Sequence, residues 1–310
     1  MRPECTIVIY HSVGSLLKEK YLNAKGLSEK DFSGQLDFFS NNYNIITLRD
    51  YADFLRVRSE IPEKSCILTF DDGFKNNYLN AFPILKQKKI SACFFPSTLP
   101  LTEFVVLPVH QTKFLLAEAG AKILADEFNQ ILKNDFPDFL SKFFVEGKIK
   151  KDKRYKWDDP LTANLKYSVS NLPQGPRNKI LNQIFGRHFK DTESISKDLY
   201  MNFEEMREMM AHGMIFGSHS HSHSKLSELG KAEQVKEIKD SKEILEKGLG
   251  TEIKLFSYPY GSYNKITTEI LGNYGYDCAI TTDYGINYGN DINAFALKRL
   301  DTLDFPFKGN

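Results

Sequence analysis

The sequence is poor in the features that mark disulfide-stabilised, nucleic-acid-binding and membrane-spanning proteins. It has four cysteines in 310 residues and no C-x-x-C pair, which excludes a disulfide framework and a zinc knuckle. Its 41 basic and 40 acidic residues nearly cancel, so no nucleic-acid partner is expected. No apolar run approaches the roughly 18 residues of a membrane span, and residues 6–10 are too short for the core of a signal peptide. We therefore expect a soluble, cytoplasmic protein with no membrane span.

The chain is instead an alternation of short apolar runs with amphipathic stretches. The runs predict strands at residues 6–10, 44–47, 66–70, 90–95, 214–217, 253–258, 278–281 and 296–300. The amphipathic stretches predict helices at residues 31–41, 48–57, 76–89, 203–212, 233–247 and 267–274. Apolar strands that alternate with helices indicate an α/β fold whose parallel sheet is buried on both faces. About seven such units favour a barrel, in which the carboxyl ends of the strands share one face.

One long segment breaks this rhythm. Residues 99–202 contain helical patterns, among them 111–119, 121–133 and 176–188, and no run comparable to the barrel strands. We therefore expect residues 1–98 and 203–310 to form the barrel, and residues 99–202 to form a helical insertion or cap.

Two short segments carry most of the chemistry. The first, Thr69-Phe70-Asp71-Asp72-Gly73, places two carboxylates at the end of an apolar run. Adjacent side chains on a strand point in opposite directions, so where the strand turns one carboxylate can face a metal and the other a pocket. Gly73 allows the sharp exit, although Asp-Asp-Gly alone also fits an ordinary turn.

The second segment, residues 217–223, holds three of the seven histidines of the chain. His219 and His223 are four positions apart, so in a helical or turn-like segment they share a face while His221 points away. In a continued strand all three would share a face, and in an exposed loop none need bind anything. Two imidazoles and one carboxylate, with an open position for water, are typical of a mononuclear metallohydrolase.

These segments resemble the motifs of polysaccharide deacetylases, the NodB-like carbohydrate esterase family four. Its T-F-D-D-G motif matches residues 69–73, and its H-[S/T]-x-x-H motif matches His219, Ser220 and His223. Its third motif leads from a strand into Pro-Tyr/Trp-Gly, and residues 256–261 match the second half. The resemblance covers residues 5–98 and 203–303. It implies a distorted (β/α)7 barrel with a helical insertion, and metal-dependent amide hydrolysis on an N-acylated amino-sugar glycan.

The resemblance also implies a role for each matched residue. Asp71 becomes the general base, and the backbone N–H of Tyr260 becomes an oxyanion donor. The metal ligands become Asp72, His219 and His223. Two nitrogens and one oxygen suit zinc first, with cobalt or nickel as alternatives.

The chain departs from the usual pattern at the general acid. Ser257 stands where the third motif usually has arginine, and Leu297-Lys298-Arg299 replaces the usual Leu-x-His. One branch of the family begins with a Tyr-His pair at the end of the first strand, which Tyr10-His11 matches. We therefore predict that His11 protonates the leaving amine.

Two further residues are predicted to support this machinery. Arg299 could replace the missing arginine in orienting Asp71, and Asp283, which ends a predicted strand, could tune His11. The remaining histidines, His110, His188 and His212, are interpreted as structural or exposed.

The residues leave two other functions open. The same site could serve a deformylase or another non-peptide amidohydrolase acting on a lipid-linked or small substrate. The chain could also be an inactive glycan-binding module that keeps its metal, but a pure binder needs no base such as Asp71. A glycosidase is disfavoured, because its two carboxylates must flank the scissile bond from separated positions.

Overall fold

The computed structural model describes residues 3–15, 26–57, 60–147, 158–289 and 292–307. The chain divides into two compact units, one of residues 1–18, 25–104 and 197–310, the other of residues 19–24 and 105–196. Among the described residues, no helix combines the length and the apolar character needed to cross a membrane.

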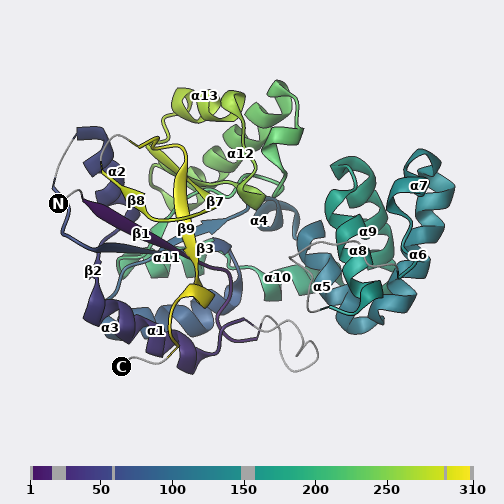
Figure 1. The fold of residues 1–310 in the computed structure, drawn as a ribbon, viewed down its shortest axis with the longest axis horizontal. Coiled ribbons are helices and arrows are strands. Elements are labelled where there is room, and N and C mark those ends of the chain that lie inside the picture. Colours follow the sequence, from purple (N-terminus) through teal and green to yellow (C-terminus); the bar gives the residue numbers. More distant parts are fainter. Residues whose placement is uncertain (1–2, 16–25, 58–59, 148–157, 290–291, 308–310) are drawn as a thin grey trace. The chain divides into compact units, whose positions relative to one another are not determined.

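The first unit is built around a ring of parallel strands (Figure 1). In spatial order these are β5 (Ile215–Phe216), β4 (Cys93–Pro96), β3 (Ser65–Asp72), β1 (Glu4–Tyr10), β9 (Leu297–Asp301), β7 (Cys278–Tyr284) and β6 (Leu255–Ser257). Ser218, just after β5, forms a parallel bridge with Phe256 of β6, which joins the two ends of this order. The ring is thus a nearly closed barrel, and the predicted (β/α)7 fold is confirmed.

Two further strands have only two residues each. β2 (Asn44–Ile45) pairs with β3, and β8 (Asn287–Tyr288) runs antiparallel to β1. β8 has no counterpart among the predicted strands, because Asn287 and Tyr288 belong to no apolar run.

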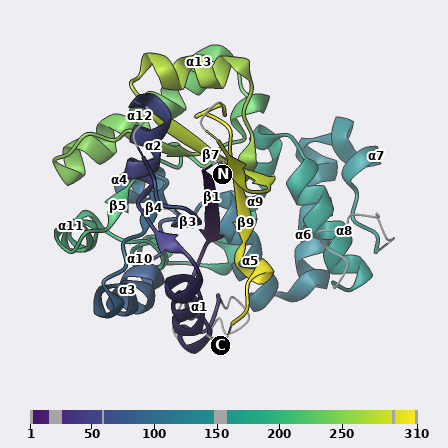
Figure 2. The same cartoon turned by 60° about the vertical axis from the view of Figure 1, so that its left-hand side comes forward.

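Helices surround the strands, as Figure 2 shows. The longer ones are α1 (Glu29–Asn42), α2 (Leu48–Val57), α3 (Phe82–Lys88), α11 (Phe203–Ala211), α12 (Lys231–Leu249) and α13 (Lys265–Asn273). Short helical segments are η2 (Asn77–Ala81), α4 (Leu99–Glu103), η5 (Leu226–Glu228), η6 (Pro259–Gly261) and η7 (Thr302–Asp304). The helix predicted at 76–89 is therefore two elements, because η2 is a π-helical turn that leads into α3.

An aromatic ladder covers the outer face of four neighbouring strands. Tyr10, Phe70, Phe94 and Phe216 occupy paired positions on β1, β3, β4 and β5. Their rings are stacked, with centroids 4.8, 4.6 and 5.6 Å apart along the row. These rings belong to the large apolar cluster that includes residues of the surrounding helices, such as Leu36 of α1.

The opposite face of the strands fills the barrel interior. Ile7, Ile67, Phe95 and Ile280 belong to a second apolar cluster, which also contains Tyr51 of α2. Most strand members of this cluster lie near the amino ends of their strands, so α2 closes that end of the barrel. Three cysteines, Cys5, Cys93 and Cys278, pack in the same cluster, and all four cysteines are buried and free. They therefore pack as small buried hydrophobes, in agreement with the absence of a disulfide framework expected from the sequence.

The second unit is helical in its described part, residues 105–147 and 158–196, which contains no strand. Its elements are α5 (Pro108–Glu118), α6 (Gly120–Asp135), η3 (Pro137–Phe139), α7 (Leu140–Phe143), α8 (Pro160–Asn171), α9 (Gln174–His188) and most of α10 (Thr192–Leu199). Phe114, Phe128 and Ile180 are buried in its core. A role as a cap over the barrel stays a prediction.

Phe70→Ala should destabilise the protein, because the ring is fully buried between those of Tyr10 and Phe94. Removing a buried phenylalanine side chain costs about 3–5 kcal/mol of the free energy of unfolding, which urea denaturation would measure. Tyr284→Ala is the control, since that ring is 72% exposed. Equal losses in the two variants would contradict the role of the ladder.

Candidate metal centre and catalytic site

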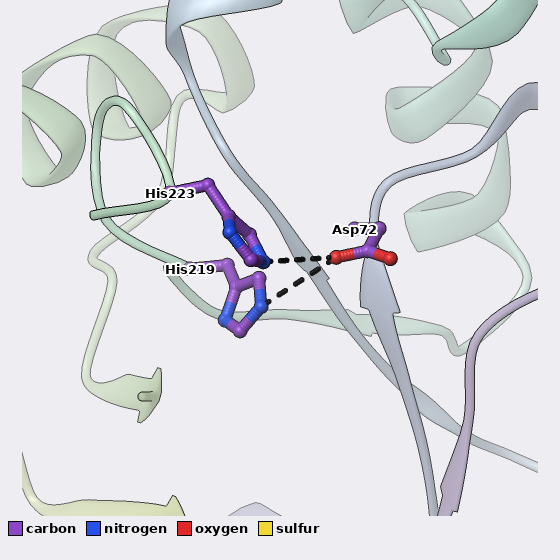
Figure 3. Close-up of side chains that lie close together, drawn as sticks. All are labelled: Asp72, His219 and His223. Atoms are coloured by element: carbon purple, nitrogen blue, oxygen red, sulfur yellow. Dashed lines mark ion pairs between the residues drawn. The ribbon is translucent and has the colours of Figure 1, made fainter. Parts of the chain in front are cut away.

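Three predicted metal ligands meet in a buried cluster at the carboxyl end of the barrel. Asp72 ends β3, and His219 and His223 lie in the loop after β5. Their ligand atoms lie within 4.8 Å of one another. The Nε2 atoms of His223 and His219 are 3.3 and 3.6 Å from Asp72 Oδ1, and Figure 3 shows both rings directed at this carboxylate.

The backbone at two of these three residues is left-handed. Asp72 has φ 72° and His223 has φ 57°, while Ser220 between the two histidines has φ 60°. Residues other than glycine rarely adopt such angles. The loop therefore turns sharply enough to bring two imidazoles of the chain together, with ring centroids 4.8 Å apart. His221 is not part of the cluster, because its Nδ1 lies 2.8 Å from Thr98 Oγ1.

Gly73 occupies a position that has no room for a side chain. Its φ is +70°, and a Cβ built there would lie 2.6 Å from Pro96 Cβ of β4. This is the sharp exit from the strand that the sequence motif predicts.

His219 is prepared to act as a ligand through Nε2. Its Nδ1–H donates to the carbonyl of Ser257 at 2.7 Å, which leaves the Nε2 lone pair directed at Asp72. Burial lowers the pKa of His219 to about 4, so the imidazole is neutral near pH 7. A backbone carbonyl that accepts a hydrogen bond from the other ring nitrogen is the usual way to fix the tautomer of a metal-binding histidine. The donor set of two imidazoles and one carboxylate therefore fits a divalent transition metal.

Asp71 lies beside this cluster and is paired with Arg299. The guanidinium of Arg299 donates from Nη1 to Asp71 Oδ1 at 3.1 Å and from Nη2 to Oδ2 at 2.7 Å. The two side chains are only 1% and 4% exposed. The predicted contact between Arg299 and Asp71 is therefore present.

The neighbouring polar groups complete this pair. Ser257, which stands where the family usually has arginine, donates its hydroxyl to Asp71 Oδ1 at 3.0 Å. Arg299 Nε–H donates to the carbonyl of Thr281 at 2.7 Å, and its Nη1 lies 3.3 Å from Thr69 Oγ1. The arginine missing from β6 is thus supplied from β9. No sequence pattern marks the Thr281 carbonyl, because only the folded barrel brings it near.

Arg299 determines the charge state of Asp71. Burial alone would favour the neutral acid and raise the pKa of Asp71. The charge of Arg299 opposes this effect, together with His219, the hydrogen bonds from Arg299 and His11, and the net result is a lowered pKa of Asp71. The carboxylate is therefore ionised at neutral pH and can accept a proton.

Tyr260 borders the cluster on the other side. Its ring meets that of His223 edge to face, with centroids 4.8 Å apart, and is 39% exposed. The backbone of Tyr260 is also left-handed, with φ 59°. Lys225 Nζ lies 5.7 Å from the centre of the ring.

His11 follows β1 next to Asp71. The register pairs Tyr10 with Phe70, so His11, which follows β1, comes level with Asp71 on β3. β1 also lies beside β9, as expected for the first and last strands of a barrel. Asp283 does not hold His11, since neither side chain has a hydrogen bond or ion pair to the other in the part of the chain that the structure describes. An effect of Asp283, which lies on the exposed end of β7, on His11 over a longer distance stays a prediction.

The other three histidines lie outside the metal cluster. His188 Nε2 is 2.7 Å from Glu127 Oε2, and His212 Nδ1 is 2.9 Å from the carbonyl of Glu208. His110 is buried in α5.

Comparison with known proteins gives the family. The model of the family described as polysaccharide deacetylase matches residues 58–106 and 182–279, which include the metal cluster, Asp71 and Tyr260. The chain belongs to the polysaccharide deacetylase family. It is accordingly a hydrolase that acts on the amide carbon–nitrogen bond of acetylated sugars. His11 and Arg299 lie outside the matched residues, so the matched family pattern includes neither.

Related proteins cover nearly the whole chain. "Putative polysaccharide deacetylase YxkH" of Bacillus subtilis (strain 168) is 22% identical over 296 residues, which are 95% of this chain and 70% of that protein. The structure of Streptococcus pyogenes deacetylase PplD in complex with acetate is 19% identical with TM-score 0.61, covering 97% of this chain and 93% of its own. IcaB from Ammonifex degensii is also 19% identical, with TM-score 0.57 and coverages of 97% and 92%. At these identities the two structures support the fold.

Replacing Arg299 by methionine should destabilise the protein, because Asp71 would become a buried charge without a partner. Losing one member of a buried ion pair costs about 3–5 kcal/mol, so the free energy of unfolding in urea should fall by that amount. Asp71→Asn in the Arg299→Met background removes the stranded charge and should recover part of the loss. A double variant no more stable than Arg299→Met would contradict this interpretation of the pair.

Proposed function

We propose that the protein is a metal-dependent N-deacetylase that removes the acetyl group from an amino sugar in a glycan or cell-surface polysaccharide pathway. The observation that carries the proposal is the ionised carboxylate of Asp71 beside the cluster of Asp72, His219 and His223. A divalent metal held by these three residues, zinc first, would polarise the amide carbonyl and make a nearby water more acidic.

The residues of the chain supply the proton transfers in this proposal. Asp71 accepts the proton of the attacking water, and Arg299 holds its carboxylate in place for that task. The backbone N–H of Tyr260 stabilises the negative charge that develops on the carbonyl oxygen, a contribution typically worth about 10²-fold in rate. His11 protonates the leaving amine. Its position just after β1, level with Asp71 on β3, supports this role.

A function in glycan binding alone is disfavoured, because burying the charged carboxylate of Asp71 costs free energy. A module that only held a metal would gain nothing from a second buried carboxylate that needs its own buried arginine. A deformylase would use the same residues of the site. Only its product, formate instead of acetate, would distinguish it from a deacetylase. The expected cytoplasmic location stays a prediction, which fractionation of cells would test.

The zinc-loaded protein should release acetate from N-acetylated amino sugars or their oligomers, measured by an acetate assay. Asp71→Asn should lower kcat by roughly 10²- to 10⁴-fold, since it removes the general base. This variant should still bind metal, whereas His219→Ala should lose it, which elemental analysis would measure. Release of formate would favour the deformylase, and no carboxylate from any sugar or lipid-linked glycan would overturn the proposal.

His11→Asn should separate substrates by their leaving groups. Without a general acid, hydrolysis of the N-acetyl amide should slow by roughly 10²- to 10⁴-fold, because an amine leaves only when protonated. Hydrolysis of an aryl acetate, whose leaving group needs no proton, should change little. Equal losses on both substrates would mean that His11 is structural and that another residue is the acid.

A further inference from the structure

The loop that carries two of the three metal ligands is held from both sides. On one side, residues that follow β4 bind its backbone: Thr98 N–H donates to the carbonyl of Ser220 at 3.3 Å, and Leu99 N–H donates to that of His221 at 2.9 Å. Ser97 Oγ–H donates to the carbonyl of His219 at 2.8 Å. The residues on this side therefore donate hydrogen bonds to the backbone carbonyl groups of the loop.

On the other side, one carboxylate of α12 satisfies its N–H and hydroxyl groups. Glu237 Oε2 accepts from the backbone N–H of His221 at 3.0 Å and of Ser222 at 2.8 Å. Glu237 Oε1 accepts from the hydroxyl of Ser222 at 2.5 Å and, less closely, from that of Ser224 at 3.5 Å. Both oxygens of the carboxylate therefore bind the segment between the two ligands.

No cation accounts for the position of Glu237. Among the described residues it makes no ion pair, although it is only partly exposed. Its charge is instead stabilised by the N–H dipoles of the loop, in charge-assisted hydrogen bonds about twice as strong as neutral ones. Its interactions are thus directed at the loop.

The loop needs such an anchor because its backbone is strained. Ser220 and His223 are both left-handed, at φ 60° and 57°, a conformation that is unfavourable for residues other than glycine. A free loop would relax toward ordinary angles, and the imidazole of His223 would turn away from Asp72. Bonds to His221 and Ser222, which lie between the two strained residues, oppose this relaxation.

We propose that Glu237 is a positioning residue of the metal centre, which holds the loop so that His219 and His223 converge on Asp72. The inference rests on the metal centre of the proposed function. Glu237 does not touch the metal, and it acts by fixing the ligands before the metal arrives.

The test is the affinity of the metal-free protein for Co²⁺, measured by competition with a chromophoric chelator. Loss of an outer-shell partner lowers metal affinity by roughly 10- to 100-fold, so we expect Glu237→Ala to raise the dissociation constant by this factor. Glu237→Gln, which keeps one acceptor oxygen, should give an intermediate value. Glu243→Ala is the matched control on the same helix, since its carboxylate is exposed and 3.8 Å from Lys239 Nζ, and it should leave the affinity unchanged.

A second readout reports on the loop alone. Amide hydrogen exchange at His221 and Ser222 should be faster in Glu237→Ala than in the unaltered protein, and unchanged in Glu243→Ala. If Glu237→Ala does not fold, the affinity and exchange of Glu237→Gln decide the matter.

The outcomes separate this inference from the proposed function. If the unaltered protein binds no metal, the proposed metal centre fails, and so does the inference that depends on it. If the unaltered protein binds metal and the Glu237 variants bind it equally well, the inference alone is overturned. The same holds if Glu243→Ala loses as much affinity as Glu237→Ala.

Discussion

The site depends on a salt bridge inside the barrel. Arg299 reaches from β9 to Asp71 on β3, and its other donors bind the Thr281 carbonyl on β7 and approach Thr69. Buried charges are costly unless paired and fully hydrogen-bonded, so this arrangement requires the strands to keep their places. Beneath it, the apolar interior and α2 close the amino end of the barrel. The pair therefore keeps a carboxylate ionised and ties together strands from both halves of the chain.

The sequence predicts the parts of this protein that leave a local pattern. Apolar runs predict the long strands, and the spacing of His219 and His223 with the Asp-Asp-Gly turn predicts the residues that cluster at the carboxyl end of the barrel. The two-residue strand β8 has no period to detect. Arg299 and Asp71 are 228 positions apart, so only closure of the barrel makes them neighbours. Glu237 looks like any other glutamate on an amphipathic helix, because its role depends on which loop packs beside it.

Strained backbone gathers around the ligands. The described residues other than glycine with positive φ are Lys64, Asp72, Lys89, Phe104, Ser220, His223 and Tyr260. Four of these seven, Asp72, Ser220, His223 and Tyr260, lie at the site. Such strain persists only where the surroundings over-determine the conformation. Here the apolar packing on both faces of the strands stabilises the fold. Hydrogen bonds from the residues after β4 and from Glu237 of α12 hold the loop after β5 in its strained conformation.

The order of the strands has a consequence during synthesis. β1, β3 and β4 leave the ribosome first, but β5 and β9, which flank them in the ring, follow only after the helical unit, with β9 about 200 residues after β4. At a translation rate of about 5–20 residues per second, β9 arrives roughly ten to forty seconds later. Until β5 has been made, the nascent chain carries a small sheet whose outer strands, β1 and β4, both lack a neighbour, and open sheet edges are templates for aggregation. A parallel ring whose neighbouring strands lie far apart in the sequence thus leaves strand edges uncovered while the chain is being made.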